Sequence, residues 1–307
     1  METSKLSLPQ AQEQFVDMMR RLDENAISGF FSWIQNNWIN DLDVKSNDMS
    51  DAMLDTIARD LRDSLPLEAI LPSENIRPPS SGKNADCDPK TTVHVDAFLY
   101  DDELVDKLCE DGHLARNYCT QCGSHKTRPL TFISHSASTE RLHFIFQCML
   151  PPLDGKIVLD IGSRLGAVLY GAYVFTQAEK IVGVEMNSEL CAMQMGVVCR
   201  YKLQDRIQVV EADISSRPDI IMAADVIIMN NVFEFFLSTK RQHELWSFLR
   251  HTIKTGTLLV TIPPLEQSET GIDLSTWVEE IPAFNLEGAK PTMSEEEMQE
   301  LGLYKVK

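Results

Sequence analysis

The stretch IVLDIGSRLGAVLYGAYVFTQAEKIVGVE, residues 157–185, predicts the central unit of the fold. Its first apolar run ends on Asp160, and short, branched, uncharged runs of this kind form strands buried on both faces of a parallel sheet. A turn from Gly162 to Gly166 and a helix-compatible segment lead to a second apolar run, which ends on Glu185. This order predicts a strand, a glycine turn, a helix and a strand. Its terminal acid lies about twenty residues beyond the turn, where dinucleotide-type folds bind ribose hydroxyls.

The same alternation of apolar runs and helical segments continues towards the C-terminus. Further buried strands are expected at residues 206–210, 225–229 and 257–262, with helices at 188–203 and 239–254. Residues 277–281 and 303–307 are expected to form an antiparallel pair. A strand–helix alternation of this length predicts a doubly wound, mostly parallel α/β sheet with right-handed crossovers.

The chain before this unit divides by composition. Residues 1–71 carry apolar side chains at helical spacing and predict a helical N-terminal region, including an aromatic cluster at 30–39 and a third helix capped at Ser50-Asp51. This region is interpreted as a packing domain or as a module that binds a substrate or partner. Residues 72–90 are rich in Pro, Ser, Gly, Asn and Asp and are interpreted as a linker. A Cys/His-containing segment follows at 91–128, and the sheet domain occupies 129–307.

Hydrophobic content and net charge limit the kinds of partner that the protein can bind. A hydrophobic content of 43% supports a sizeable core, and the net charge of −18 disfavours non-specific binding to nucleic acid. The acidic balance suits a basic protein partner or simply serves solubility, and local basic patches leave RNA open. No apolar run is long enough to span a bilayer, and residues 1–10 lack a signal-peptide layout. We therefore expect an intracellular protein, cytoplasmic or nuclear, without membrane contact.

The cysteines argue against a disulfide framework, because seven is an odd number and no secretory signal is evident. Cys119 and Cys122 have the spacing of a zinc knuckle, and Cys109 and His113 could supply two more ligands for a structural zinc. His135 lies further along the same Cys/His-rich stretch. The alternative interpretation of the patch is a set of reduced thiols in a loop.

Four polar side chains stand at the expected carboxyl ends of strands: Asp160, Glu185, Asp213 and Asn230. Ligands of open α/β sheets bind beyond those strand ends, so the four residues predict a shared ligand pocket. Asp213 could instead serve only as a helix cap.

Two motifs carry a resemblance to a known family over residues 156–264. The pattern D-x-G-x-x-x-G, from Asp160 to Gly166, resembles motif I of class I S-adenosylmethionine-dependent methyltransferases. The segment VIIMNNVFEF, which contains Asn230 and Phe233, is similar to the N-N-F-type segment of the non-SET histone lysine methyltransferases.

The resemblance implies a seven-strand Rossmann-like fold, S-adenosyl-L-methionine as cofactor, and methylation of a nitrogen on a protein, with lysine as a candidate acceptor. It implies cofactor contacts for a set of residues at the strand ends and in the glycine turn: Asp160, Gly162, Ser163, Gly166, Glu185, Asp213 and Asn230. Glu185 would bind ribose hydroxyls and Asp213 the adenine amine. Asn230 would also orient the acceptor amine, and Phe233 would provide an aromatic wall.

Two positions depart from the family pattern. Arg164 stands where the family has a glycine, and it could block the cofactor, point outward or pair with the cofactor's carboxylate. Val232 separates the asparagines from Phe233. These departures leave open a catalytically inactive, methyltransferase-like binding or scaffold protein, and an enzyme that acts on RNA or a small molecule also stays open.

Overall fold

The computed structural model describes residues 8–23, 26–27, 29–30, 46–79, 87–88, 90–120, 126–285 and 293–307. The chain divides into two compact units, residues 1–50 and 51–307. In the first unit, the amphipathic helix α1 (Leu8–Arg21) exposes Phe15, Val16 and Met18. Most of the expected aromatic cluster, residues 31–39, lies outside the described residues, and the four-part domain division stays a prediction. Helix α3 (Ser46–Arg62) begins four residues before the expected Ser50 cap and continues into the second unit.

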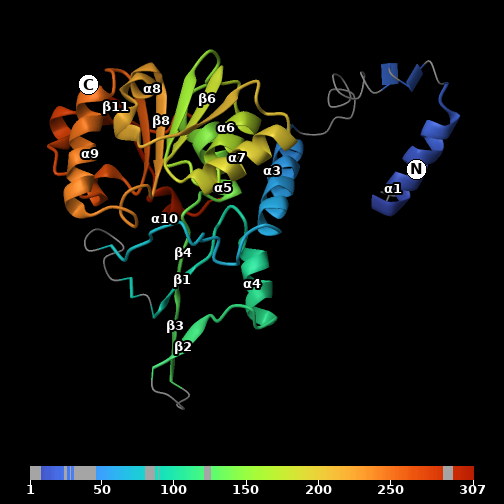
Figure 1. The fold of residues 1–307 in the computed structure, drawn as a ribbon, viewed down its shortest axis with the longest axis horizontal. Coiled ribbons are helices and arrows are strands. Elements are labelled where there is room, and N and C mark those ends of the chain that lie inside the picture. Colours follow the sequence, from blue (N-terminus) through green and yellow to red (C-terminus); the bar gives the residue numbers. More distant parts are fainter. Residues whose placement is uncertain are drawn as a thin grey trace. The chain divides into compact units, whose positions relative to one another are not determined.

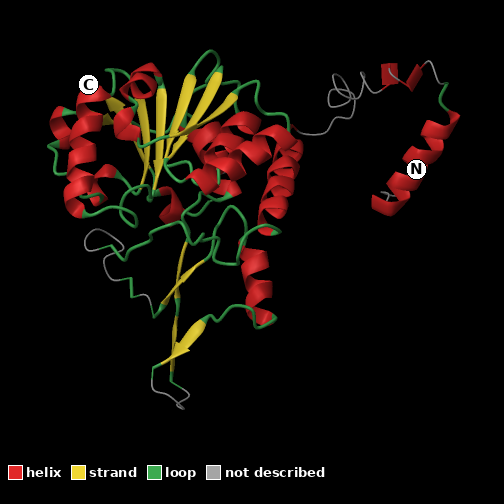
Figure 2. Cartoon of the chain, in the orientation of Figure 1, coloured by secondary structure: helices red, strands yellow, loops and turns green. Residues whose placement is uncertain are grey.

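The second unit contains a seven-stranded sheet in the order β10-β11-β9-β8-β5-β6-β7 (Figures 1 and 2). Strands β5 to β9 run parallel, while β11 is antiparallel to both β9 and β10. The strands are β5 (Ile157–Ile161), β6 (Lys180–Glu185), β7 (Ile207–Glu211), β8 (Val226–Asn230), β9 (Leu258–Ile262), β10 (Val278–Glu280) and β11 (Gly302–Val306). This architecture confirms the predicted mostly parallel sheet and its antiparallel terminal pair.

The apolar runs that predicted the central strands are buried because helices cover both faces of the sheet. Leu159 of β5 lies between Val182 of β6 and Ile227 of β8 in the register, and all three side chains are buried. Their neighbour Val158 belongs to the core on the opposite face. Successive residues of a strand point to opposite faces, so a strand between two helical layers must be apolar throughout.

One face of the sheet packs against α3, α6 (Ala167–Phe175), α7 (Ser188–Arg200) and α5 (Thr139–His143), which continues as a π-helical turn over Phe144–Met149. The other face packs against α8 (Pro218–Ala223) and α9 (Thr239–Thr252), as Figure 1 shows. The segment from Leu142 to Met149 is buried almost throughout and belongs to the same core as α6 and Leu303 of β11.

Four short strands and one helix lie between α3 and α5 in the described part of the chain. Strand β1 (Thr92–His94) pairs in parallel with β4 (Thr131–Ile133), and β2 (Asn117–Cys119) pairs antiparallel with β3 (Thr127–Pro129). Helix α4 (Asp102–Glu110) starts at Asp101, whose side chain accepts a hydrogen bond from the backbone of Leu104. Helix α10 (Glu295–Met298) precedes β11. Within the described residues, no helix has the length and apolar character that crossing a membrane requires.

A pair of glycine substitutions tests this packing. A Cβ on Gly183, in the middle of β6, would lie 2.7 Å from Cδ1 of Leu169 and 2.8 Å from Oγ of Ser163. We expect Gly183→Ala to lower the free energy of unfolding by about 1–3 kcal/mol, the usual cost of overpacking. Gly196, at an exposed position of helix α7, has open space around a built Cβ. Gly196→Ala should therefore raise stability by about 0.5–1 kcal/mol through helix propensity. Urea unfolding measures both, and equal effects would contradict the packing described for β6.

Candidate functional site

A cavity of about 430 Å³ lies at the carboxyl ends of β5, β6, β7 and β8. The chain runs outward from β5 through β6 and β7 on one side, and through β8 and β9 on the other. Open α/β sheets bind their ligands at such a switch point, beyond the carboxyl ends of the strands. Five of the residues that the sequence predicted for the site line this cavity: Gly162, Glu185, Asp213, Asn230 and Phe233.

Three other predicted residues support the glycine turn from behind the cavity wall. Asp160 and Ser163 are 2% and 5% exposed, and neither they nor Gly166 belongs to the lining. Burial, together with the nearby charge of Glu185, raises the pKa of Asp160 well above its ordinary value. Gly166 has φ +87°, and a Cβ there would lie 2.6 Å from the hydroxyl of Tyr170. These residues therefore shape the turn, and direct contact with a ligand stays a prediction for them.

Glu185 orients the turn and the helix that follows β6. Its Oε2 accepts a hydrogen bond from the backbone N–H of Arg164 at 3.0 Å, and its Oε1 accepts one from the N–H of Asn187 at 2.8 Å. The side chain of Asn187 in turn caps α7. An ionised carboxylate has about four lone-pair positions, so these two bonds leave Glu185 able to accept others from a ligand.

Gln194 is a functional residue that the sequence reasoning missed. Its side chain is fully buried, its Nε2 donates to the carbonyl of Arg164 at 2.7 Å, and its Oε1 accepts from the hydroxyl of Ser163 at 2.9 Å. The sequence does contain a signal for Gln194, since it is a polar residue on the apolar face of its helix, four positions after Leu190. Gln194 and Glu185 thus hold the backbone of the glycine turn from two sides.

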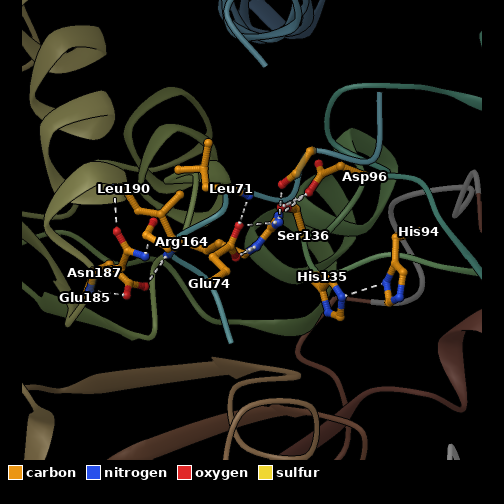
Figure 3. A network of polar contacts seen from close by, with 12 residues as sticks. Leu71, Glu74, His94, Asp96, His135, Ser136, Arg164, Glu185, Asn187 and Leu190 are labelled. Carbon is orange, nitrogen blue, oxygen red and sulfur yellow. Dashed lines mark hydrogen bonds and ion pairs between the residues drawn. The ribbon is translucent and has the colours of Figure 1, made fainter. Parts of the chain in front are cut away.

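Arg164 points its guanidinium away from the glycine turn, into a buried network (Figure 3). Its Nε lies 2.9 Å from Oε1 of Glu74, its Nη1 lies 2.8 Å from Oδ2 of Asp96, and its Nη2 donates to the carbonyl of Ala69. All three charged side chains are at most 7% exposed. Arg164 has φ +44°, a conformation that favours glycine, which fits the glycine that the family pattern has here. Arg164 lines the cavity together with Glu74, and its guanidinium is paired within the protein. The three alternatives for its effect on the cofactor stay predictions.

A segment from the expected linker forms part of the cavity wall. Ser73, Glu74 and Asn75 line the cavity, and the hydroxyl of Ser73 accepts a hydrogen bond from Nδ2 of Asn187 at 2.9 Å. The backbone N–H of Arg77 donates to the carbonyl of Phe235 at 2.7 Å. Composition predicted a linker here, but these long-range contacts attach the segment to both edges of the site.

The end of β8 and the turn after it form the opposite wall. Nδ2 of Asn230 donates to the carbonyl of His135 at 3.1 Å, while its Oδ1 is buried with no hydrogen-bond partner in the described part of the chain. Phe233 is 5% exposed, and its ring packs edge-on against Trp246 with centroids 5.1 Å apart. A Cβ on Gly162 would overlap the side chain of Val232. Val232 therefore covers the glycine turn from this side.

Asp213 has the capping role that the sequence left open. Its Oδ1 accepts hydrogen bonds from the backbone and hydroxyl of Ser215 at 2.9 and 2.8 Å, and its Oδ2 pairs with Nη2 of Arg241 at 3.0 Å. Burial would raise the pKa of Asp213, but these bonds outweigh it and lower the pKa below its ordinary value. Asp213 and Arg241 both line the cavity, so Asp213 caps its helix and also forms part of the cavity wall.

The predicted zinc ligands are only partly covered by the structure. Cys109 lies on α4, His113 follows that helix, and Cys119 ends β2, while Cys122 falls outside the described residues. Within the ranges described, no group of three or more His, Cys, Asp or Glu side chains is placed to hold a metal ion. The four-residue zinc site stays a prediction.

No protein-family model and no curated protein matches this chain. Solved structures similar to it include an RNA methyltransferase from Salinibacter ruber in complex with S-adenosyl-L-homocysteine, at 17% identity over 54% of this chain and 86% of that chain, with a TM-score of 0.35. A SAM-dependent O-methyltransferase from Thermotoga maritima is 15% identical over 57% and 67%, with a TM-score of 0.40.

Geranyl diphosphate C-methyltransferase from Streptomyces coelicolor A3(2) is 17% identical over 40% of this chain and 42% of that chain, with a TM-score of 0.34. At such identities and TM-scores, the activities and substrates of these proteins cannot be inferred for this chain. The resemblance to the histone lysine methyltransferases likewise stays a prediction.

The Arg164 network gives a prediction with a matched control. Arg164→Met leaves the buried carboxylates of Glu74 and Asp96 unpaired, so we expect it to lower the free energy of unfolding by about 3–5 kcal/mol. Arg200→Met removes a pair with Asp60 at a similar distance, 2.7 Å, but on the surface, and should leave the urea midpoint nearly unchanged. Similar urea midpoints for the two variants would show that the network contributes little to the fold.

Proposed function

We propose that this protein is an S-adenosylmethionine-dependent methyltransferase that methylates a nitrogen atom of a protein substrate. The observation that carries the proposal is the single cavity lined together by Gly162, Glu185, Asp213 and Asn230. The family resemblance assigns cofactor contacts to these same four residues. Each comes from a different strand end, so their meeting in one cavity does not follow from any one motif.

The chain's residues fit the cofactor in their chemistry. A carboxylate at the end of β6, a second at the end of β7 and a glycine with φ +73° after β5 border the cavity. Arg164 lines the cavity, but its guanidinium is engaged by Glu74 and Asp96, so its charge does not need the cofactor's carboxylate as a partner. The unpaired, buried Oδ1 of Asn230 further supports a ligand with hydrogen-bond donors.

When bound, S-adenosylmethionine supplies a methyl group on a positively charged sulfonium. Glu185 would hold the ribose hydroxyls, and Asp213 would accept a hydrogen bond from the adenine amine. Asn230 accepts a hydrogen from the incoming amine and directs its lone pair for an in-line displacement, in which alignment supplies much of the rate. Phe233 and Phe236, both in the lining, exclude water from that end of the cavity.

A basic segment of a protein is the acceptor best supported by charge. A second cavity of about 840 Å³ has Asn231 in its wall, as the first cavity does. Its wall combines one basic residue, Arg141, which pairs with Glu300 at 2.8 Å, with several acids. The acidic residues in that wall are Asp101, Asp102, Glu103, Glu140, Glu297 and Glu300. Together with the net charge of −18, this wall favours a cationic substrate over RNA.

One observation favours a second candidate function, that of a catalytically inactive binding protein. Val232 packs against Gly162, where the resemblance expects the methionine part of the cofactor. A protein that keeps this contact would bind the cofactor weakly or not at all.

Titration calorimetry with S-adenosylmethionine separates the two candidates. We expect micromolar binding to the wild-type protein and a loss of about 10- to 100-fold with Glu185→Gln, which weakens the ribose contacts. Glu211→Gln is the matched control, because Glu211 pairs with Glu185 in the register of β6 and β7 but does not line the cavity. No binding by the wild type would support the catalytically inactive binding protein. Equal losses of affinity in both variants would show that the cofactor does not bind at Glu185.

A further inference from the structure

His135 belongs to the cavity wall and has an unused ring nitrogen. It lies just after β4, is 6% exposed, and lines the cavity beside Asn230. Its Nε2 is 3.0 Å from Nδ1 of His94, and Figure 3 marks this contact with a dashed line. Its Nδ1 is buried and has no hydrogen-bond partner among the residues that the structure describes. Buried polar atoms almost always have a hydrogen-bond partner in folded proteins. We therefore expect this nitrogen to bond to a group outside the described part of the chain.

Packing holds the ring of His135 in place. The ring lies edge to edge with that of His94, with centroids 5.1 Å apart, and it meets the rings of Phe235 and Phe236 edge-on at 5.0 and 5.4 Å. The ring is therefore held among three aromatic neighbours before any ligand binds. Because its position is already fixed, little conformational entropy is lost when it bonds to a ligand.

The histidine pair is neutral at physiological pH. Burial, then the charge of Arg164, then His94 lower the pKa of His135 to about 3, and burial followed by Arg164 lowers the pKa of His94. A neutral pair with nitrogens 3.0 Å apart shares one hydrogen between Nε2 of His135 and Nδ1 of His94. When that hydrogen is on Nε2, Nδ1 of His135 is a hydrogen-bond acceptor.

Asn230 contributes a second acceptor to the same wall. Its Nδ2 is engaged with the carbonyl of His135, which orients the amide and leaves Oδ1 as the free end. That Oδ1 is also buried and unpaired in the described part of the chain. With the shared hydrogen on Nε2 of His135, two adjoining residues of one cavity wall each offer one unpaired acceptor.

We propose that Nδ1 of His135 and Oδ1 of Asn230 together accept the two N–H groups of a primary amine, the atom that receives the methyl group. His135 is then a catalytic residue, and His94 is a positioning residue that fixes its tautomer. The inference rests on the proposed function and narrows its substrate class, because an oxygen acceptor carries one such hydrogen and a carbon acceptor carries none that these groups bind well.

The chemistry of the transfer explains why two neutral acceptors help. The amine enters uncharged, and its lone pair forms the new N–C bond while the C–S bond breaks and leaves its electron pair on sulfur. The nitrogen keeps both hydrogens and becomes positively charged, so the product leaves as the methylated ammonium. The proton released overall is the one that the substrate ammonium gives up to water before the uncharged amine binds. Hydrogen bonds from N–H strengthen as the nitrogen gains charge, so both acceptors stabilise the transition state more than the bound amine.

Analogues of S-adenosylhomocysteine test the proposal without a known substrate. In three of them the sulfur is replaced by a nitrogen that carries a 2-aminoethyl, a 2-hydroxyethyl or a propyl arm, and calorimetry measures their binding beside S-adenosylhomocysteine itself. We expect the amino arm to bind about 10-fold or more tightly than the propyl arm, with the hydroxyl arm between them.

Substitutions at His135 assign that preference to one atom. Asn places a polar atom near the position of Nδ1, whereas Gln places one near Nε2. The amino-arm preference should persist in His135→Asn and disappear in His135→Gln and His135→Leu, while affinity for S-adenosylhomocysteine stays within a few-fold and confirms folding. No preference in the wild type, or an unchanged preference in His135→Leu, would overturn the inference alone. Failure of all four compounds to bind the wild type would overturn the proposed function as well.

The tautomer is a readout that requires neither cofactor nor substrate. Nitrogen-15 NMR of histidine-labelled protein at pH 7 should show the His135 hydrogen on Nε2, with Nδ1 unprotonated. His94→Phe keeps an aromatic ring beside His135 but removes the acceptor nitrogen, so it should mix the two tautomers. A hydrogen on Nδ1 in the wild type would make His135 a donor and would rule out the proposed contact.

Discussion

The buried ion pairs of Arg164 with Glu74 and Asp96 connect the parts of this protein that would otherwise meet only through loops. Arg164 belongs to the glycine turn after β5, while its two acids come from segments that precede the sheet by more than sixty residues of chain. Charges this deeply buried are costly unless each is paired, so the three side chains hold one another in a single arrangement. The cavity wall formed by Ser73, Glu74 and Asn75 depends on that arrangement.

The same arginine links the architecture to the chemistry of the site. Its backbone N–H and carbonyl are held by Glu185 and Gln194, which fixes the glycine turn at the floor of the cavity. Its positive charge contributes to the lowered pKa of both His94 and His135, and so helps to keep that pair neutral. One residue that departs from the family pattern therefore stabilises the turn, anchors the wall and, together with burial, helps to keep a neighbouring wall residue uncharged.

The sequence was informative wherever the signal was local. Apolar runs gave the parallel strands, and because parallel strands end at the same edge, the polar residues after them predicted the cavity. Contacts between distant segments had no such signal. Ser73 to Arg77 have the composition of a linker, yet bonds to Asn187 and Phe235 attach them to the site. His135 was grouped with a Cys/His patch by proximity in sequence, whereas β4 delivers it to the cavity beside Asn230.

A crystal structure of the protein with S-adenosyl-L-homocysteine tests the central claim most directly, namely that the network around Arg164 completes a cofactor cavity. We predict the ribose hydroxyls within hydrogen-bond distance of Glu185, the sulfur facing Asn230 and His135, and the Arg164 guanidinium still paired with Glu74 and Asp96. A ligand bound outside the strand ends, or one that displaces Arg164 from those acids, would contradict the account.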